Sequence, residues 1–130
     1  MEGAQKRRQT REEQAESFLE LAREEAAVGY STDDHRRVRD SAEKTWLSVC
    51  EAVNASMERR GKSPPVGRKA HSERRNFLEA IDRGLAAELS LFADKLHGDC
   101  FYDGDCPTKE AMRTDMTQAE QFIRRVKALK

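Results

Sequence analysis

Apolar side chains recur every three or four positions along most of this chain, and no segment alternates apolar and polar residues with the period of two that marks a strand. This spacing gathers the apolar residues on one face of a helix, so the pattern predicts a series of amphipathic helices. Thr10 and Glu13 form a capping box that begins the first helix, and Gly29 interrupts its pattern. The core positions predicted for this helix are Ala15, Phe18, Leu19, Ala22 and Ala26.

Asp33 or Asp34 can cap a second helix, and Gly61 stops it. The segment from Gly61 to Gly67 contains Pro64-Pro65 and predicts a connection without helix. The inward face of the second helix is predicted to carry Val38, Ala42, Trp46, Val49, Val53 and Met57.

Three further helices follow. A short one is predicted from Ser72 to near Gly84, a fourth from about Leu85 to Leu96, and Thr108 caps the last. Their predicted inward positions are Phe77, Leu78, Ile81, Leu85, Leu89, Phe92, Leu96, Ala111, Met112, Met116, Ala119, Phe122, Ile123, Val126 and Leu129. We therefore predict an all-α fold, an up-and-down helical bundle of about five helices, with residues 1–9 as a flexible N-terminal arm and residues 10–130 as a single domain.

Composition narrows the classes of function. The chain has 24 basic and 24 acidic residues, so no overall field attracts nucleic acid or an anionic membrane. No apolar run approaches the roughly 20 residues that span a bilayer, and the charged start from Met1 to Arg8 lacks the apolar region of a secretory signal. We expect a cytoplasmic protein with no membrane association. Its three cysteines are then expected to be reduced, which disfavours a sterically conceivable disulfide between Cys100 and Cys106.

The segment from Leu96 to Pro107, predicted to be a loop, gathers the residues most suited to site chemistry. His97, Cys100 and Cys106 form an incomplete zinc-ligand set, because no second ligand pair stands elsewhere in the chain. Cys100 with His97 and a nearby aspartate could form a nucleophilic site, although no elbow motif accompanies them. Tyr102 is predicted to be an anchor with a buried ring and a bonded hydroxyl. We predict no bound metal and no cofactor.

A basic stretch surrounds the proline connection and continues into the next helix. Such a patch can contact the phosphates of a nucleotide or RNA, although no aromatic residue is interleaved for base stacking. His71 lies within it and could act as a base. The candidate ligand-binding residues are Arg68, Lys69, Arg74, Arg75, His97 and Tyr102.

Two short motifs carry a resemblance to a known family. The segment Ser41-Ala42-Glu43-Lys44-Thr45-Trp46, followed by Leu96-His97 and Phe101-Tyr102, resembles the HEPN superfamily and, more narrowly, is similar to its archaeal PaREP-type branch. The similarity extends from about Thr10 to Leu129. It implies an up-and-down helical bundle that often dimerises, sometimes with a nucleotidyltransferase partner in a toxin–antitoxin system.

Many HEPN proteins are metal-independent ribonucleases with an arginine four to six residues before a histidine. None of the three histidines here has that arginine. Our main hypothesis is therefore a non-catalytic homodimer that binds a nucleotide, RNA or a protein partner, such as a nucleotidyltransferase-type protein. The alternatives are a toxin-type or degenerate metal-independent ribonuclease with His97 as its catalytic residue, and a zinc-dependent module.

Overall fold

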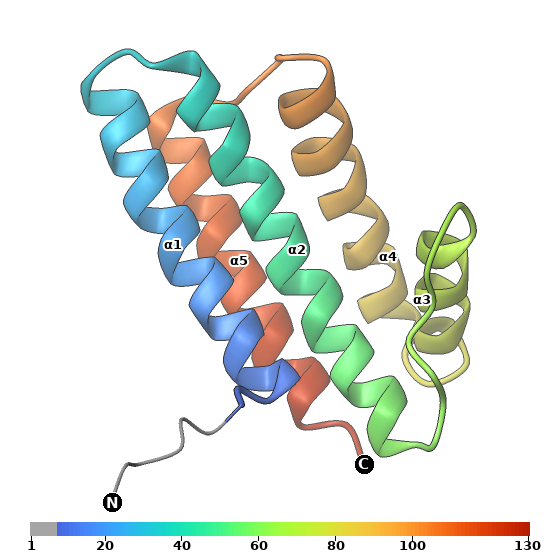
Figure 1. Cartoon of the computed structure of the whole chain (residues 1–130). Coiled ribbons are helices and arrows are strands. Elements are labelled where there is room, and N and C mark those ends of the chain that lie inside the picture. The colour runs from blue at the N-terminus through green and yellow to red at the C-terminus, as the bar shows by residue number, and fades with distance from the viewer. Residues whose placement is uncertain (1–7) are drawn as a thin grey trace, which may run out of the picture.

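The computed structural model describes residues 8–130, and every regular element within that range is a helix (Figure 1). The helices are α1 (Arg11–Ser31), α2 (His35–Arg59), α3 (Ala70–Glu79), α4 (Arg83–Phe92), η1 (Ala93–Tyr102) and α5 (Lys109–Lys127). The prediction of an all-α fold is confirmed. No helix in the described part of the chain is both long enough and apolar enough to cross a membrane.

Helices α1, α2, α4 with η1, and α5 run alternately up and down, and α3 lies beside α4 at one end (Figure 1). The π-helix η1 continues α4 without a break, so α4 and η1 make one rod and the prediction of about five helices holds. Of the predicted N-terminal arm, residues 1–7 lie outside the described range. Arg8 and Gln9 have no regular structure, and Gln9 Nε2 donates a hydrogen bond to Ser17 Oγ at 3.2 Å.

Side-chain caps start the helices where the sequence predicts them. Thr10 accepts from the Glu13 amide at 3.1 Å while the Glu13 carboxylate accepts from the Thr10 amide, which completes the capping box. Of the two candidate aspartates, Asp34 caps α2 through the Arg37 amide. Thr108 caps α5 through the Ala111 amide at 3.2 Å. Gly61 follows α2 with a φ of 74°, which closes the helix as predicted.

The predicted boundary between the third and fourth helices is wrong. The structure begins α3 at Ala70, before Ser72, and ends it at Glu79. Asp82 then accepts a hydrogen bond from the Leu85 amide at 3.1 Å and starts α4 at Arg83. Gly84 therefore lies in the first turn of α4 and does not end α3, because the aspartate cap restarts the helix ahead of the glycine.

Most of the predicted inward positions are buried in one continuous core. Ala111 is an exception: it is exposed, and the buried face of α5 begins one residue later, at Met112. Phe18 is half-buried because its ring lines a surface groove. Periodicity fixes the direction of an apolar face, whereas the neighbouring helices decide where that face ends.

Candidate ligand-binding groove

The segment that carries His97 is helical, not a loop as predicted. The π-helix η1 extends to Tyr102, and the amide of Asp103 donates to the carbonyl of Gly98, five residues back, at 3.0 Å. His97 and Phe101 consequently lie on one face with their rings stacked at 6.1 Å. The Tyr102 ring lies nearly perpendicular to the His97 ring, and the two ring centroids are 4.8 Å apart. Insertions of π-helix into α-helices are frequent at functional sites.

His97 is oriented by a carboxylate on another helix. Its Nδ1 lies 2.7 Å from Oε1 of Glu43 on α2, and no described residue forms a hydrogen bond with its Nε2. If Nδ1 carries the proton, it donates to the carboxylate and leaves Nε2 as a free acceptor. This pairing is the arrangement that fixes a histidine for proton transfer or for binding a polar ligand.

Trp46 brings together two histidines from different helices. The centroid of its ring lies 5.6 Å from the ring centroid of His71 on α3 and 5.9 Å from the ring centroid of His97 on η1. Trp46 itself is buried on α2, as its apolar position predicted. The indole of α2 therefore packs against side chains of both α3 and η1.

A groove of about 590 Å³ passes over this cluster, between the outer faces of α1 and α2. Phe18 and Leu47 supply apolar wall, and Trp46, His97 and Arg74 also line it. Arg74 is held in place because its Nε donates to Asn54 Oδ1 at 2.8 Å. Its Nη groups have no hydrogen-bond acceptor among residues 8–130, so they remain available to a ligand.

The two carboxylates that line the groove are already paired. Glu43 bonds to His97, while Glu51 accepts from Arg11 at 3.1 Å and from Asn54 at 2.9 Å. Arg11 offsets the negative charge of Glu51, which reduces the repulsion that an anionic ligand would meet there, whereas Glu43 keeps its charge when it accepts from a neutral His97.

Burial shifts the pKa values of two further groups near the groove, the His71 imidazole and the Cys50 thiol. Desolvation lowers the pKa of His71, and the nearby Arg75 and Arg74 lower it further, so the imidazole is neutral at pH 7. The Nδ1 atom of His71 is buried without a hydrogen-bond partner in the described chain. Desolvation raises the pKa of the Cys50 thiol to about 12, so this residue is not a thiolate nucleophile at neutral pH.

The structure places some of the predicted ligand-binding residues in the groove and others outside it. Arg74 and His97 both line the groove, whereas Arg68 and Lys69 are exposed in the connection before α3. Arg75 does not line the groove, although its charge acts on His71. Tyr102 is 64% exposed and its hydroxyl has no partner in residues 8–130, so the predicted buried anchor is wrong: the ring packs against other rings at the end of η1.

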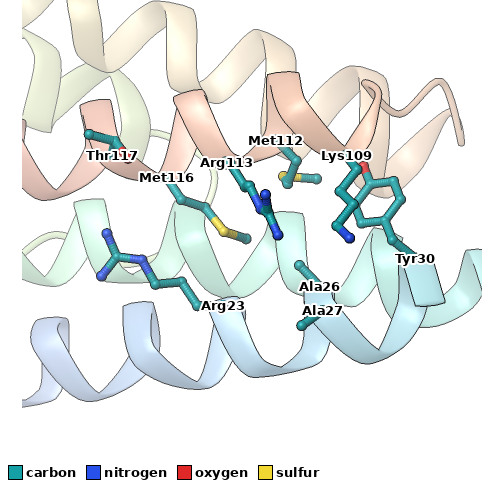
Figure 2. A pocket seen from close by; sticks show the side chains of 9 residues that line it. All are labelled: Arg23, Ala26, Ala27, Tyr30, Lys109, Met112, Arg113, Met116 and Thr117. Carbon is teal, nitrogen blue, oxygen red and sulfur yellow. The ribbon is translucent and has the colours of Figure 1, made fainter.

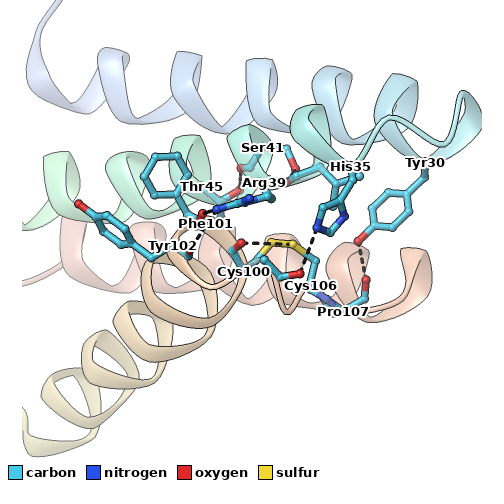
Figure 3. Close-up of a disulfide and its surroundings, with 12 residues drawn as sticks. Tyr30, His35, Arg39, Ser41, Thr45, Cys100, Phe101, Tyr102, Cys106 and Pro107 are labelled. Atoms are coloured by element: carbon cyan, nitrogen blue, oxygen red, sulfur yellow. Dashed lines mark hydrogen bonds between the residues drawn. A yellow bond between two sulfur atoms is a disulfide. The ribbon is translucent and has the colours of Figure 1, made fainter.

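Cys100 and Cys106 form a disulfide, contrary to the expectation of reduced thiols (Figure 3). The chain turns at Gly104, where φ is 75°, and brings Cys106 back to the buried Cys100 on η1. Both sulfurs are bonded, so neither is a zinc ligand or a nucleophile in this state, which removes the proposed sets with His97. Within residues 8–130, no group of three or more potential ligand side chains is placed to hold a metal ion.

Polar contacts from the start of α2 and the end of α1 secure the disulfide segment (Figure 3). Arg39 donates to the carbonyls of Phe101 and Tyr102 at distances of 2.6–2.9 Å, which satisfies the free end of η1. His35 Nε2 lies 3.0 Å from the Gly104 carbonyl, and the Tyr30 hydroxyl donates to the Pro107 carbonyl at 2.7 Å.

Sequence reasoning did not select Glu43 as a site residue. A signal for it was present, because Glu43 stands three residues before Trp46 on one helix, and that spacing places both side chains on neighbouring parts of one face. Comparison of the chain with protein-family models, curated proteins and solved structures gives no match.

Proposed function

We propose that this protein works by binding, and that the groove over Trp46 takes an anionic ligand with a planar ring, such as a nucleotide. The observation that carries the proposal is that Arg74 and His97, from two different helices, line one groove together with Trp46. Arg74 offers unpaired guanidinium donors to a phosphate, and His97 Nε2 offers a polar contact. Phe18 and Leu47 give apolar surface against which a ring can pack.

Trp46 gives a direct test because it is the only tryptophan in the chain. We expect AMP to change its fluorescence saturably, and adenosine to bind more weakly because it lacks the phosphate. Arg74→Gln should weaken AMP binding by about tenfold or more, since a hydrogen bond to a charged group is lost. Arg68→Gln removes the same charge from an exposed position outside the groove and should leave the affinity unchanged.

If both arginine variants weakened AMP binding equally, overall charge would account for the binding, and the groove would not be the binding site. Circular dichroism of Arg74→Gln provides the folding control, because this arginine also bonds to Asn54.

The bond between Glu43 and His97 favours a second candidate, a metal-independent ribonuclease. His97 Nε2 would accept the proton of a 2′-hydroxyl as the 2′-oxygen attacks the phosphorus, and Arg74 would stabilise the negative charge that develops on the phosphate. The bond from phosphorus to the 5′-oxygen would break, and the 5′-oxygen would take a proton from water. Arg74 would supply from α3 the arginine that no histidine of this chain has four to six residues before it in sequence. We expect cleavage of single-stranded RNA in the presence of a chelator, abolished by His97→Gln and reduced by Glu43→Gln. Pure, folded protein without such cleavage would contradict this candidate.

We further propose a homodimer that uses the apolar edge of the same groove. Leu21 on α1 is 50% exposed and Leu47 on α2 is 40% exposed, and both line the groove. Sedimentation should show a dimer that Leu47→Glu converts to a monomer; a monomeric wild type would contradict it.

HEPN membership, a nucleotidyltransferase-type partner and a toxin–antitoxin role are proposals that rest on the motif resemblance.

We also keep a cytoplasmic location as a proposal. Cytoplasmic disulfides are usually transient or redox-sensing, so in that compartment the Cys100–Cys106 bond would respond to the redox state.

A further inference from the structure

A second pocket, of about 330 Å³, lies between α1 and α5 (Figure 2). It shares no lining residue with the groove over Trp46. Ala26 and Ala27 of α1 face Met112 and Met116 of α5, and the small alanine side chains leave the space that the pocket occupies. Its wall is apolar and includes two methionines, whose flexible thioether side chains adapt to the shape of a ligand.

Cationic groups surround this apolar wall. Arg23, Lys109 and Arg113 line the pocket, and no acidic residue does. Arg23 is paired with Glu120 at 2.8 Å, which also lowers the pKa of that carboxyl. Lys109 and Arg113 form no ion pair or side-chain hydrogen bond with any residue of the described chain. Both side chains extend from α5 toward α1, over the pocket (Figure 2).

We propose that this pocket binds a free amphipathic carboxylate, with its apolar body against the methionines and its carboxylate between Lys109 and Arg113. The chemistry follows from the juxtaposition: an apolar wall favours a hydrocarbon or aromatic body, and two unpaired cations favour one anionic head. The unused cations are what distinguish this pocket from an ordinary gap between helices. The site is independent of the proposed function of the groove.

Decanoate is the probe for the experiment, used below its micellar concentration in isothermal titration calorimetry. We expect saturable binding of one decanoate per chain and no binding of decyltrimethylammonium, which has the same chain length and the opposite charge. The double variant Lys109→Gln/Arg113→Gln should weaken decanoate binding at least tenfold. Both positions are exposed, so this variant is expected to fold. Lys127→Gln, an exposed lysine of α5 outside the pocket, should bind as the wild type does.

Ala27→Phe tests the apolar half of the site. Ala27 is exposed and lines the pocket, so a ring added there fills the space and should abolish binding without altering the core. Equal binding of decanoate and decyltrimethylammonium, or full affinity in the double variant, would overturn the proposal. Binding to phosphatidylglycerol vesicles without binding of decanoate would assign the surface to a membrane lipid and also overturn it. Arg74→Gln should leave decanoate binding unchanged, which separates this outcome from that of the groove.

Discussion

Gly29 allows α1 and α2 to approach closely at the turn between them. A Cβ atom at this buried position would lie 3.0 Å from both Cγ2 and N of Val38. Alanine would gain about 0.5–1 kcal/mol of helix preference, but the steric overlap costs about 1–3 kcal/mol and involves backbone that cannot move aside freely. We expect Gly29→Ala to lower the free energy of unfolding, measured in urea.

Gly98→Ala is the matched control for that substitution. Its Cβ would meet only the carbonyl of Ala93, at an ordinary 3.6 Å, so the helix preference should prevail and stabilise the protein slightly. If Gly29→Ala proved as stable as Gly98→Ala, close packing would not be what requires glycine at position 29.

Residue-scale features were predictable wherever their causes are local. The caps at Thr10, Asp34 and Thr108 depend on an amide three residues away, and the sequence displays both partners. The bond between Glu43 and His97 joins positions 54 residues apart. Only the packing of α2 against η1 brings these residues together, and periodicity alone does not specify which side chains then meet.

At the scale of elements, the main error was the segment from Leu96 to Pro107. Its glycines and aspartates favour a loop by local preference. Tertiary contacts override that preference, because Leu96 and Cys100 are buried and Arg39 satisfies the carbonyls at the end of η1. Local sequence preference does not predict the disulfide either, because the two cysteines meet only when the fold brings them together.

The disulfide should stabilise the native state by restricting the unfolded chain. Its cysteines are six residues apart, and for so short a loop the chain-entropy relation gives about 2 kcal/mol. We expect dithiothreitol to lower the free energy of unfolding of the wild type, measured in urea, by this amount. The double variant Cys100→Ser/Cys106→Ser should start at the lower value and be insensitive to dithiothreitol. A reductant effect of equal size in the double variant would point instead to Cys50, the remaining free thiol.

At the scale of the whole molecule, the sequence predicts the bundle because each long helix carries one continuous apolar face. The burial of α2 on several sides is harder to predict from the apolar pattern. Its buried residues extend from Val38 to Met57 and include Ser41, Thr45 and Ser48. These hydroxyls donate to carbonyls one turn back on the same helix, so α2 can be enclosed on several sides. Helices α1, α3, η1 and α5 all pack against it.

The peripheral position of α3 predicts a gradient of stability across the bundle. Only Phe77 and Leu78 of this helix are buried, and its N-terminus has no side-chain cap, whereas α2 is buried over most of its length. We therefore expect hydrogen exchange of the α3 amides to be faster than that of the central α2 amides, because local opening of α3 exposes less apolar surface.

Helix α3 also carries Arg74, so its opening would remove this cation from the groove. A ligand that binds only the closed groove stabilises α3 by mass action. AMP should therefore slow exchange in α3 in the wild type and have no such effect in Arg74→Gln, as measured by mass spectrometry of peptic peptides. Uniform slowing over all helices would show that α3 does not open separately. Slow exchange of α3 without AMP would show that Phe77 and Leu78 are sufficient to fix it to the bundle.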